Sequence, residues 1–204
     1  KNTLEIHHNI IGFSKFFFKV LMLTPFKKNI SFILINRSLI RDLKIYNQKY
    51  IILDDGVDIS NKKNKNSFFK KSCVYIGSFY QGKGIEIISE LSKILPDIDF
   101  HIYGDFSVLK DRNFIIKNKN IILMKKLKYS EVHSILKRYH IALMPYQNRV
   151  MVKSKNLEIS KYISPLKMFD YLAAGNIIIA SEIKSILEHP EFKFNVNYNC
   201  FDEF

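Results

Sequence analysis

The pattern of apolar and polar positions from residue 73 onward alternates between short apolar runs and amphipathic segments. The apolar runs predict strands, and apolar residues spaced three or four apart predict helices. Strands that are apolar throughout and alternate with helices are typical of a parallel sheet covered on both faces. The predicted strands are Cys73–Phe79, Asp99–Tyr103, Asn120–Met124, Ile141–Pro145 and Ile177–Ala180. The predicted helices are Ile85–Leu95, Ser130–Tyr139 with Ser130 as N-cap, Pro165–Ala174 and Ile183–His189.

The first part of the chain has a less regular pattern, which predicts a separate and smaller block. An Asp-Asp-Gly turn at residues 54–56 follows this block, and the polar, lysine-rich segment Asn61–Lys71 indicates an exposed linker. We therefore expect two domains, residues 1–57 and 58–204. The elements predicted in the first are strands at Leu4–Ile6, Ser31–Ile35 and Tyr50–Leu53 and helices at Ser14–Leu23 and Leu39–Lys49.

The helix predicted near residue 165 has a start suited to an anion. Ser164 is a good N-cap, Pro165 suits the first helical position, and Gly175 ends the helix. A helix start offers free backbone N–H groups and the positive end of the helix dipole, and Lys167 lies beside it. From spacing alone, a solvated ion pair between Lys167 and Asp170 is the simpler interpretation.

A second candidate phosphate site is the loop Gly77–Gly84, GSFYQGKG, between a predicted strand and a predicted helix. It nearly matches the P-loop pattern GxxxxGK[ST], with Lys83 in the lysine position. Gly84 stands where a Ser or Thr hydroxyl should hold Mg²⁺. The apolar run ending at Asp54 resembles the second P-loop motif only loosely, so a P-loop-like nucleotide-binding protein is the alternative.

Composition and charge favour a folded protein with anionic partners. The 204 residues are 47% hydrophobic and 25% charged, and the formal net charge is +13. No nucleic-acid-binding motif accompanies this charge, so nucleic acid is not an expected partner. Cys73 and Cys200 lack metal-ligand spacing, which indicates free thiols in a reducing compartment.

The apolar segment Phe16–Leu23 is too short to span a bilayer, which takes about 20 apolar residues. With Lys15, Lys19, Lys27 and Lys28 around it, the segment suits the surface of an anionic membrane. A buried helix with lysines at its edge fits the pattern equally well.

The two candidate phosphate sites together resemble a known family. The segments SPLKMFDYLAAGNIIIAS and YIGSFYQGKGIEIISELSKILP resemble the nucleotide-sugar (donor) domain of group 1 (family 4) glycosyltransferases of the GT-B fold. The resemblance implies that Lys83 and the helix start at Ser164, Pro165, Leu166 and Lys167 hold the diphosphate of the donor. It also implies that Asp170 binds the ribose. The family usually has Glu at position 170, Glu at Tyr162 and Arg at Ser78.

Further matches follow the same order along the chain. The resemblance places Gly77 and Ser78 at the donor phosphates, Gly104 and Lys125 near the base, and Pro145 and Tyr146 beside the sugar. The segment Glu-Ile-His-His at residues 5–8 resembles an element of the family's first domain, which makes His7 a candidate catalytic residue.

The resemblance implies a Rossmann-like α/β donor domain preceded by a remnant of the N-terminal, acceptor-side domain. The implied activity is transfer of a sugar from a nucleotide diphosphate sugar, such as a UDP- or GDP-sugar, to a hydroxyl of a saccharide or lipid-linked acceptor. Configuration at the sugar would be retained, and no metal or other cofactor is expected. Such enzymes make bacterial surface polysaccharides or glycolipids in the cytoplasm, at the inner face of the plasma membrane. Because units that should precede Glu5 are missing, a non-catalytic nucleotide-binding fragment is a further alternative.

Overall fold

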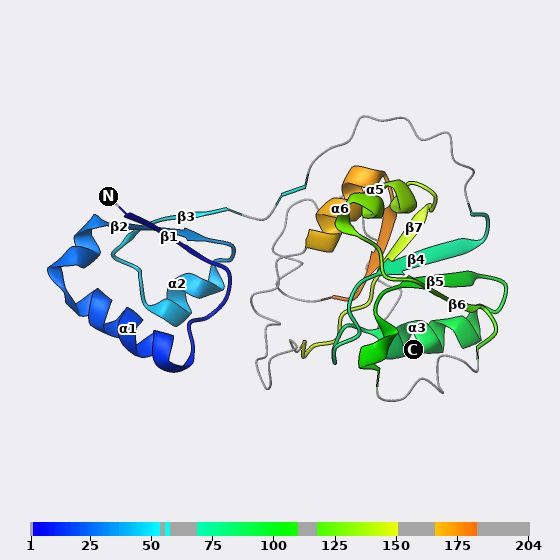
Figure 1. Ribbon diagram of the computed structural model, residues 1–204, viewed down its shortest axis with the longest axis horizontal. Coiled ribbons are helices and arrows are strands. Elements are labelled where there is room, and N and C mark those ends of the chain that lie inside the picture. Colours follow the sequence, from blue (N-terminus) through cyan, green and yellow to red (C-terminus); the bar gives the residue numbers. More distant parts are fainter. Residues whose placement is uncertain (1, 54–55, 58–68, 110–117, 151–165, 183–204) are drawn as a thin grey trace. The chain divides into compact units, whose positions relative to one another are not determined.

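The computed structural model describes residues 2–53, 56–57, 69–109, 118–150 and 166–182. They fall into two compact units (Figure 1). The first contains the described part of residues 1–55 and the second begins at Gly56, two residues before the predicted boundary. No helix within the described ranges has both the length and the apolar character needed to cross a bilayer. That the first unit is an acceptor-side remnant stays a prediction.

The first unit is a three-stranded parallel sheet with helices packed against it. Its strands lie in the order β1 (Asn2–Ile6), β2 (Ile30–Leu34) and β3 (Lys49–Ile52). The helices α1 (Gly12–Leu23) and α2 (Ser38–Leu43) lie on the same side of this sheet in Figure 1. A 3-10 turn, η1 (Pro25–Asn29), leads from α1 into β2. The core of this unit is formed by Ile6, Phe18, Ile30, Phe32, Leu34, Ile35, Leu39 and Ile45.

The predicted helix Leu39–Lys49 is wrong at its end, because α2 stops at Leu43. Lys44 adopts a left-handed conformation with φ 56°, and its N–H donates back to the carbonyls of Ile40 and Arg41. The N–H of Ile45 donates to the Ile40 carbonyl at 3.1 Å, and the Ile45 side chain is fully buried. Ile45 is the apolar position that suggested a longer helix. In the structure it lies just after the end of a shorter helix and makes the hydrophobic contact that is common there.

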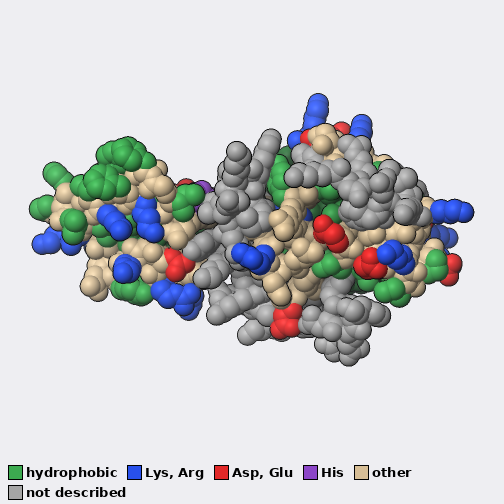
Figure 2. Space-filling model, turned by 90° about the horizontal axis from the view of Figure 1, so that it is seen from below, with side chains coloured by type: hydrophobic (Ala, Val, Ile, Leu, Met, Phe, Trp, Pro, Cys, Tyr) green, Lys and Arg blue, Asp and Glu red, His purple; other side chains and the backbone are tan. Residues whose placement is uncertain are grey.

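Helix α1 buries little of its apolar surface. Phe18 is its only buried residue, whereas Phe13 is 77% and Leu23 is 83% exposed. Three of its phenylalanine rings touch one another, with Phe13 and Phe17 centroids 4.8 Å apart. We call the exposed set the α1 patch, and Figure 2 shows apolar side chains with Lys and Arg beside them on this unit. The α1 patch consists of Phe13, Phe16, Phe17, Val20, Leu23 and Phe26.

The second unit confirms the predicted fold class. Its five parallel strands lie in the order β6-β5-β4-β7-β8, which is the order of a Rossmann-like doubly wound sheet. Helix α3 covers one face, and α5 and α6 cover the other (Figure 1). The strands are β4 (Ser72–Ile76), β5 (Asp99–Tyr103), β6 (Ile121–Met124), β7 (Ile141–Met144) and β8 (Ile177–Ala180). The helices are α3 (Ile85–Ile94), η2 (Phe106–Val108), α5 (Tyr129–Leu136) and α6 (Leu166–Ala174).

Two local predictions differ from the structure. Strand β4 ends at Ile76 instead of Phe79, because the chain leaves the sheet at Gly77. Ser130 is not the N-cap of α5, since the helix begins at Tyr129. The carboxylate of Glu131 instead accepts a hydrogen bond of 2.7 Å from the N–H of Lys128, which precedes the helix. The predicted helix Ile183–His189 and most of the predicted linker Asn61–Lys71 lie outside the described residues.

Asn176 joins the end of α5 to the start of β8. It is buried, and its side-chain N–H groups donate to the carbonyls of Leu136 at 3.0 Å and Tyr139 at 2.7 Å. Gly175, at φ 81°, precedes it and ends α6 as predicted. This amide therefore fixes the angle at which α6 returns to the sheet, and with it the position of the residues on α6.

We expect Asn176→Ala to lower the free energy of unfolding by about 1–3 kcal/mol, because buried carbonyls lose a donor. Glu90→Ala is the control, since it removes an exposed ion pair with Lys93 and should cost less than about 0.5 kcal/mol. Urea unfolding followed by circular dichroism measures both. Equal stability of the two variants would contradict the role assigned to Asn176.

Candidate functional site

The sheet of the second unit has a point where the direction of strand order reverses. The chain runs from β4 through β5 to β6 on one side and then crosses to β7 and β8 on the other. Ligands of such sheets bind outside the carboxyl ends of the strands at this switch point. Here the loops that follow β4 and β7 meet, and the N–H of Gln147 donates to the Gly82 carbonyl at 3.0 Å.

Two glycines allow these loops to touch through their backbones. Gly82 and Gly84 have φ of 84° and 83°, a conformation that favours glycine. A Cβ at Gly84 would collide with the Pro145 carbonyl, and one at Gly82 with the Arg149 carbonyl. Because no side chain fits at position 84, the hydroxyl that a P-loop places there has no counterpart.

Lys167 on α6 directs its amine into the same loops. The Nζ atom is buried and lies 4.0 Å from the ring centre of Tyr75 and 5.6 Å from that of Tyr146. It lies so close to Gly77 that a Cβ there would collide with it. Gly77 is therefore the position whose missing side chain leaves room for the lysine.

Lys83 brings a second lysine amine to the site. Its Nζ lies 4.8 Å from the ring centre of Tyr146, the ring that Lys167 also approaches. Among the described residues, neither lysine forms an ion pair, and the Lys167 Nζ has no hydrogen-bond partner. Two amines thus approach the same ring, and neither is paired with an anion from the described part of the protein.

Burial lowers the pKa of both lysines, and the charge of Lys83 lowers that of Lys167 further. Burial lowers the pKa of Lys83 below its ordinary value of 10.5. The pKa of Lys167 is lowered well below 10.5, first by burial and second by the charge of Lys83. Burial raises the pKa of Tyr146 to about 12, so this tyrosine offers the lysines a neutral ring and not a phenolate.

Asp170 and Lys167 have different neighbours, although both lie on α6. Its carboxylate accepts a hydrogen bond of 3.4 Å from the Tyr129 hydroxyl on α5. Burial raises its pKa, while the Tyr129 hydrogen bond and the charge of His133 act in the opposite direction. None of the ion pairs among the described residues joins Asp170 to Lys167, so the simpler interpretation of a solvated pair is wrong.

The other predicted residues of the second unit lie at several strand ends. The Ser78 carbonyl accepts a 2.8 Å hydrogen bond from the Tyr75 hydroxyl. Gly104 follows β5 and packs against the loop after β4, since a Cβ there would meet the Gly77 carbonyl and the Phe79 ring. Lys125 follows β6 and is exposed. The structure therefore brings Gly77, Ser78, Lys83, Gly104, Pro145, Tyr146 and Lys167 to one edge of the sheet.

The start of the predicted anion-binding helix is described only from Leu166, which is 47% exposed. Ser164 and Pro165 lie outside the described residues, and so does Tyr162. Their predicted contacts with a diphosphate stay predictions.

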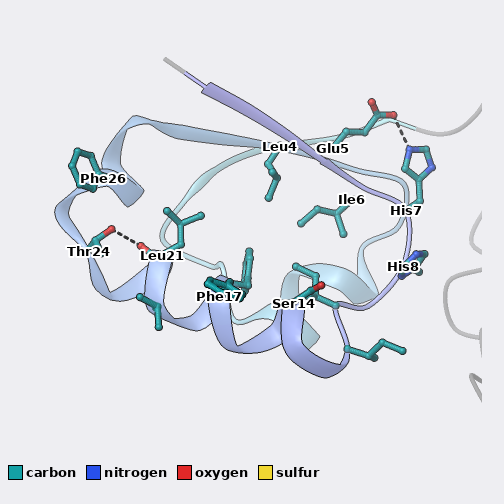
Figure 3. A pocket seen from close by; sticks show the side chains of 14 residues that line it. Leu4, Glu5, Ile6, His7, His8, Ser14, Phe17, Leu21, Thr24 and Phe26 are labelled. Atoms are coloured by element: carbon teal, nitrogen blue, oxygen red, sulfur yellow. Dashed lines mark hydrogen bonds and ion pairs between the residues drawn. The ribbon is translucent and has the colours of Figure 1, made fainter.

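His7 lies in the first unit, at the end of β1. Its Nε2 atom is 2.9 Å from a carboxylate oxygen of Glu5, and both side chains are exposed. It stands at the edge of a largely apolar groove of about 820 Å³ between β1 and α1 (Figure 3). In that view Leu4 and Ile6 from the strand and Phe17 and Leu21 from the helix line the groove.

Two residues of the site were not predicted from the sequence. Tyr75 lies in the apolar strand β4 and resembles an ordinary core residue, while Tyr129 lies at the start of α5. The one signal at Tyr75 is a hydroxyl-bearing ring two residues before a loop glycine. No group of three or more His, Cys, Asp or Glu side chains in the described ranges has an arrangement suited to a metal ion.

Comparisons with known proteins show which solved structures resemble this chain. Neither protein-family models nor curated protein sequences give a match. A glycosyltransferase from Rickettsia africae ESF-5 has a similar structure, with a TM-score of 0.66, 15% identity and coverage of 96% of this chain and 55% of that chain. TarM gives a TM-score of 0.63 and 17% identity, over 97% of this chain and 40% of that chain. Anabaena Alr3699/HepE, solved with UDP and glucose, gives a TM-score of 0.58 and 10% identity, over 91% of this chain and 54% of that chain.

These structural similarities establish the fold alone. The chain has the fold of part of these GT-B glycosyltransferases. It spans about half the length of the solved structures that it resembles, from 40% to 55%.

We expect Lys167→Met to raise the free energy of unfolding at pH 7 by about 1–3 kcal/mol, because it removes a buried amine that lacks a partner among the described residues. The folded-state pKa is below 10.5, so in the window between that pKa and 10.5 the unfolded chain binds the extra proton. Stability of the unsubstituted protein should therefore rise with pH across this window, and the advantage of the variant should shrink. Lys93→Met, at an exposed site, is the control. Urea unfolding between pH 6 and 10 checks this, and a less stable Lys167→Met variant would contradict it.

Proposed function

We propose that the second unit binds a nucleotide diphosphate sugar at its switch point and that the protein to which it belongs is a glycosyltransferase. The observation that carries this proposal is the buried amine of Lys167, which lies beside Lys83 without a partner among the described residues. Two lysine amines at the switch point of a Rossmann-like sheet suit a ligand with two adjacent anionic groups.

A diphosphate meets this requirement better than a single anion. Its two phosphates would lie in the loop between Gly77 and Gly84, with Lys83 and Lys167 on either side. Gly84 is the N-cap of the ten-residue helix α3, whose first N–H groups add donors at the same place. We further propose that the helix start at Ser164, Pro165 and Leu166 contributes backbone donors.

The remaining residues would bind the rest of the nucleotide sugar. Asp170, which now accepts a hydrogen bond from Tyr129, would accept hydrogen bonds from the ribose hydroxyls. Gly104 and Lys125, after β5 and β6, would border the base. Pro145 and Tyr146, after β7, would lie beside the sugar. The solved structure of Anabaena Alr3699/HepE with UDP and glucose supports a ligand of this class.

In the proposed reaction the bond between the anomeric carbon and the diphosphate oxygen breaks. An acceptor hydroxyl oxygen forms the new bond to that carbon and loses its proton, and the nucleoside diphosphate leaves. Negative charge grows on the departing diphosphate, where Lys83 and Lys167 would stabilise it without a metal ion. His7 is proposed to act in catalysis from the first unit. Retention of configuration is a prediction from the family resemblance.

The proposed setting is the synthesis of bacterial surface polysaccharides or glycolipids in the cytoplasm. The acceptor would be a saccharide or a lipid-linked saccharide. Since the chain spans about half the length of its structural neighbours, it is proposed to bind the donor by itself without completing the transfer.

Two observations favour this function over the P-loop alternative. The strand order of the second unit is Rossmann-like. Position 84 has no room for the magnesium-binding hydroxyl that a P-loop needs, because the Pro145 carbonyl occupies that space.

We expect thermal-shift and calorimetric titrations to detect binding of one nucleoside diphosphate and its sugar conjugate, without Mg²⁺, from a panel of UDP, GDP, ADP, CMP and TDP. Lys83→Met, Lys167→Met and Asp170→Asn should each weaken binding about 10- to 100-fold, because each removes a charged partner. Lys93→Met is the matched control and should bind normally.

The P-loop alternative predicts a different pattern. Mg²⁺–ATP or Mg²⁺–GTP would bind, Lys83→Met would abolish binding, and Asp170→Asn would have no effect. Undiminished affinity for a UDP- or GDP-sugar in both the Lys83 and Lys167 variants would contradict the site proposed here.

We also propose that the α1 patch attaches the protein to an anionic membrane surface. The patch is apolar and aromatic, and the sequence from residue 6 to residue 41 contains no Asp or Glu. The same stretch contains Lys15, Lys19, Lys27, Lys28, Arg37 and Arg41. Apolar side chains beside cations complement the acyl boundary and charged headgroups of such a membrane.

We expect the protein to sediment with vesicles that contain 30% phosphatidylglycerol and not with neutral phosphatidylcholine vesicles. The double variant Phe16→Ser/Phe17→Ser should reduce binding at least tenfold, whereas Ile94→Ser, an exposed apolar residue on α3, should not change it. Binding should weaken as salt is raised. Concentration-dependent self-association that is lost in the double variant, with no vesicle binding, would show that protein covers the α1 patch instead.

A further inference from the structure

We infer that the site takes up a proton when it binds a nucleotide diphosphate sugar: Lys167 is a neutral amine in the empty site and an ammonium in the occupied one. This inference rests on the proposed function and adds to it a charge change within the protein. It makes the affinity for the donor depend on pH through one identified residue.

The geometry of the empty site disfavours a charged Lys167. An ammonium group has three N–H donors, and in the described part of the chain the Lys167 Nζ meets no acceptor. Its closest aromatic contact is the face of the Tyr75 ring at 4.0 Å. A ring face offsets only part of the cost of removing a full charge from water. A neutral amine has a much smaller cost.

Among the described residues, no carboxylate forms an ion pair with Lys167. Lys83 is the charged group that acts on Lys167, and it repels a second cation. Burial raises the pKa of Tyr75 and, to about 12, that of Tyr146, so both rings are neutral near pH 7. Asp170 is engaged by Tyr129 on the neighbouring helix α5. The titratable groups nearby are Tyr75 on β4, Lys83 before α3, Glu86 on α3, Tyr146 after β7, and Asp170 and Tyr171 on α6.

A bound diphosphate reverses each of these conditions. Its phosphates lie between the two lysines, so that Lys83 and Lys167 face an anion instead of each other. Phosphate oxygens provide the acceptors that Lys167 lacks. One proton then passes from solvent to the Lys167 nitrogen lone pair, and no other bond forms or breaks. Affinity should therefore fall as pH rises between the pKa of the empty site and that of the complex, by up to about tenfold per pH unit.

Isothermal titration calorimetry of the full chain with UDP-glucose measures the number of protons taken up. If the panel above selects guanine, GDP-mannose replaces it. Each phosphate of these sugars keeps a single charge between pH 6.5 and 8.5, so any proton comes to the protein. Comparing PIPES, HEPES and Tris at one pH should show an uptake approaching one proton. Lys167→Met should bind more weakly with almost no uptake, whereas Lys93→Met should behave as the unsubstituted protein.

NMR titration of ¹³C-labelled lysine side chains tests the charge of the empty site without a ligand. The Lys167 signal is identified by its absence in Lys167→Met. It should titrate below the exposed lysines in the free protein and shift toward them in the complex. A Lys167 that titrates with the exposed lysines in the free protein, with normal donor binding, would overturn the inference and leave the proposed function intact. If no nucleotide sugar binds at all, the proposed function fails and the inference fails with it.

Discussion

The parallel pairing of β4 with both β5 and β7 is the constraint on which the second unit depends. Parallel strands require crossover connections, and these place every strand's carboxyl end at the same edge of the sheet. The loop Gly77–Gly84 and the segment from Pro145 onward meet there because their strands are neighbours. Gly84 tightens this meeting, since the Pro145 carbonyl fills the space of its absent side chain. The position of the donor site that we propose thus depends on the order of the strands and on a glycine that lets two loops approach closely.

A lysine amine buried between tyrosine rings is a costly arrangement that the rest of the unit must offset. The apolar cluster under the site contains Cys73, Tyr75, Phe79, Ile85, Ile88, Phe100, Ile102 and Leu143. Burial of this surface stabilises the sheet and fixes Tyr75, whose hydroxyl is also held by the Ser78 carbonyl. Residues held in unfavourable environments are common at functional sites, where ligand binding removes the strain. Here an anion beside Lys167 would relieve the unfavourable environment, and a diphosphate is the anion that we propose.

The first unit presents the opposite situation, with apolar surface left in contact with water. Its core is well packed around Phe32, Leu34 and Leu39, all of them almost fully buried. The α1 patch contributes nothing to that core, and its members Phe17, Val20 and Phe26 line part of the groove that His7 borders. Exposed aromatic groups of this extent mark interaction surfaces in folded proteins. The two units therefore offer two distinct kinds of surface, a strand edge with two lysines, where we propose that a nucleotide sugar binds, and an apolar helix face with lysines.

The sequence by itself determined the α/β class of this protein, because apolar runs and helical spacing are local signals that can be read from residues close together in the chain. It also identified Lys83 and Lys167 as candidate phosphate ligands, through loop glycines and a resemblance carried by short segments. It misplaced the end of α2 and the cap of α5, since Ile45 and Glu131 act through contacts that periodicity does not encode. Only the tertiary structure decided that Lys167 packs against Tyr75, where the charge of Lys83 acts on it, instead of pairing with Asp170. The physical reason is that burial and repulsion arise between residues distant in sequence, which strand pairing alone brings together.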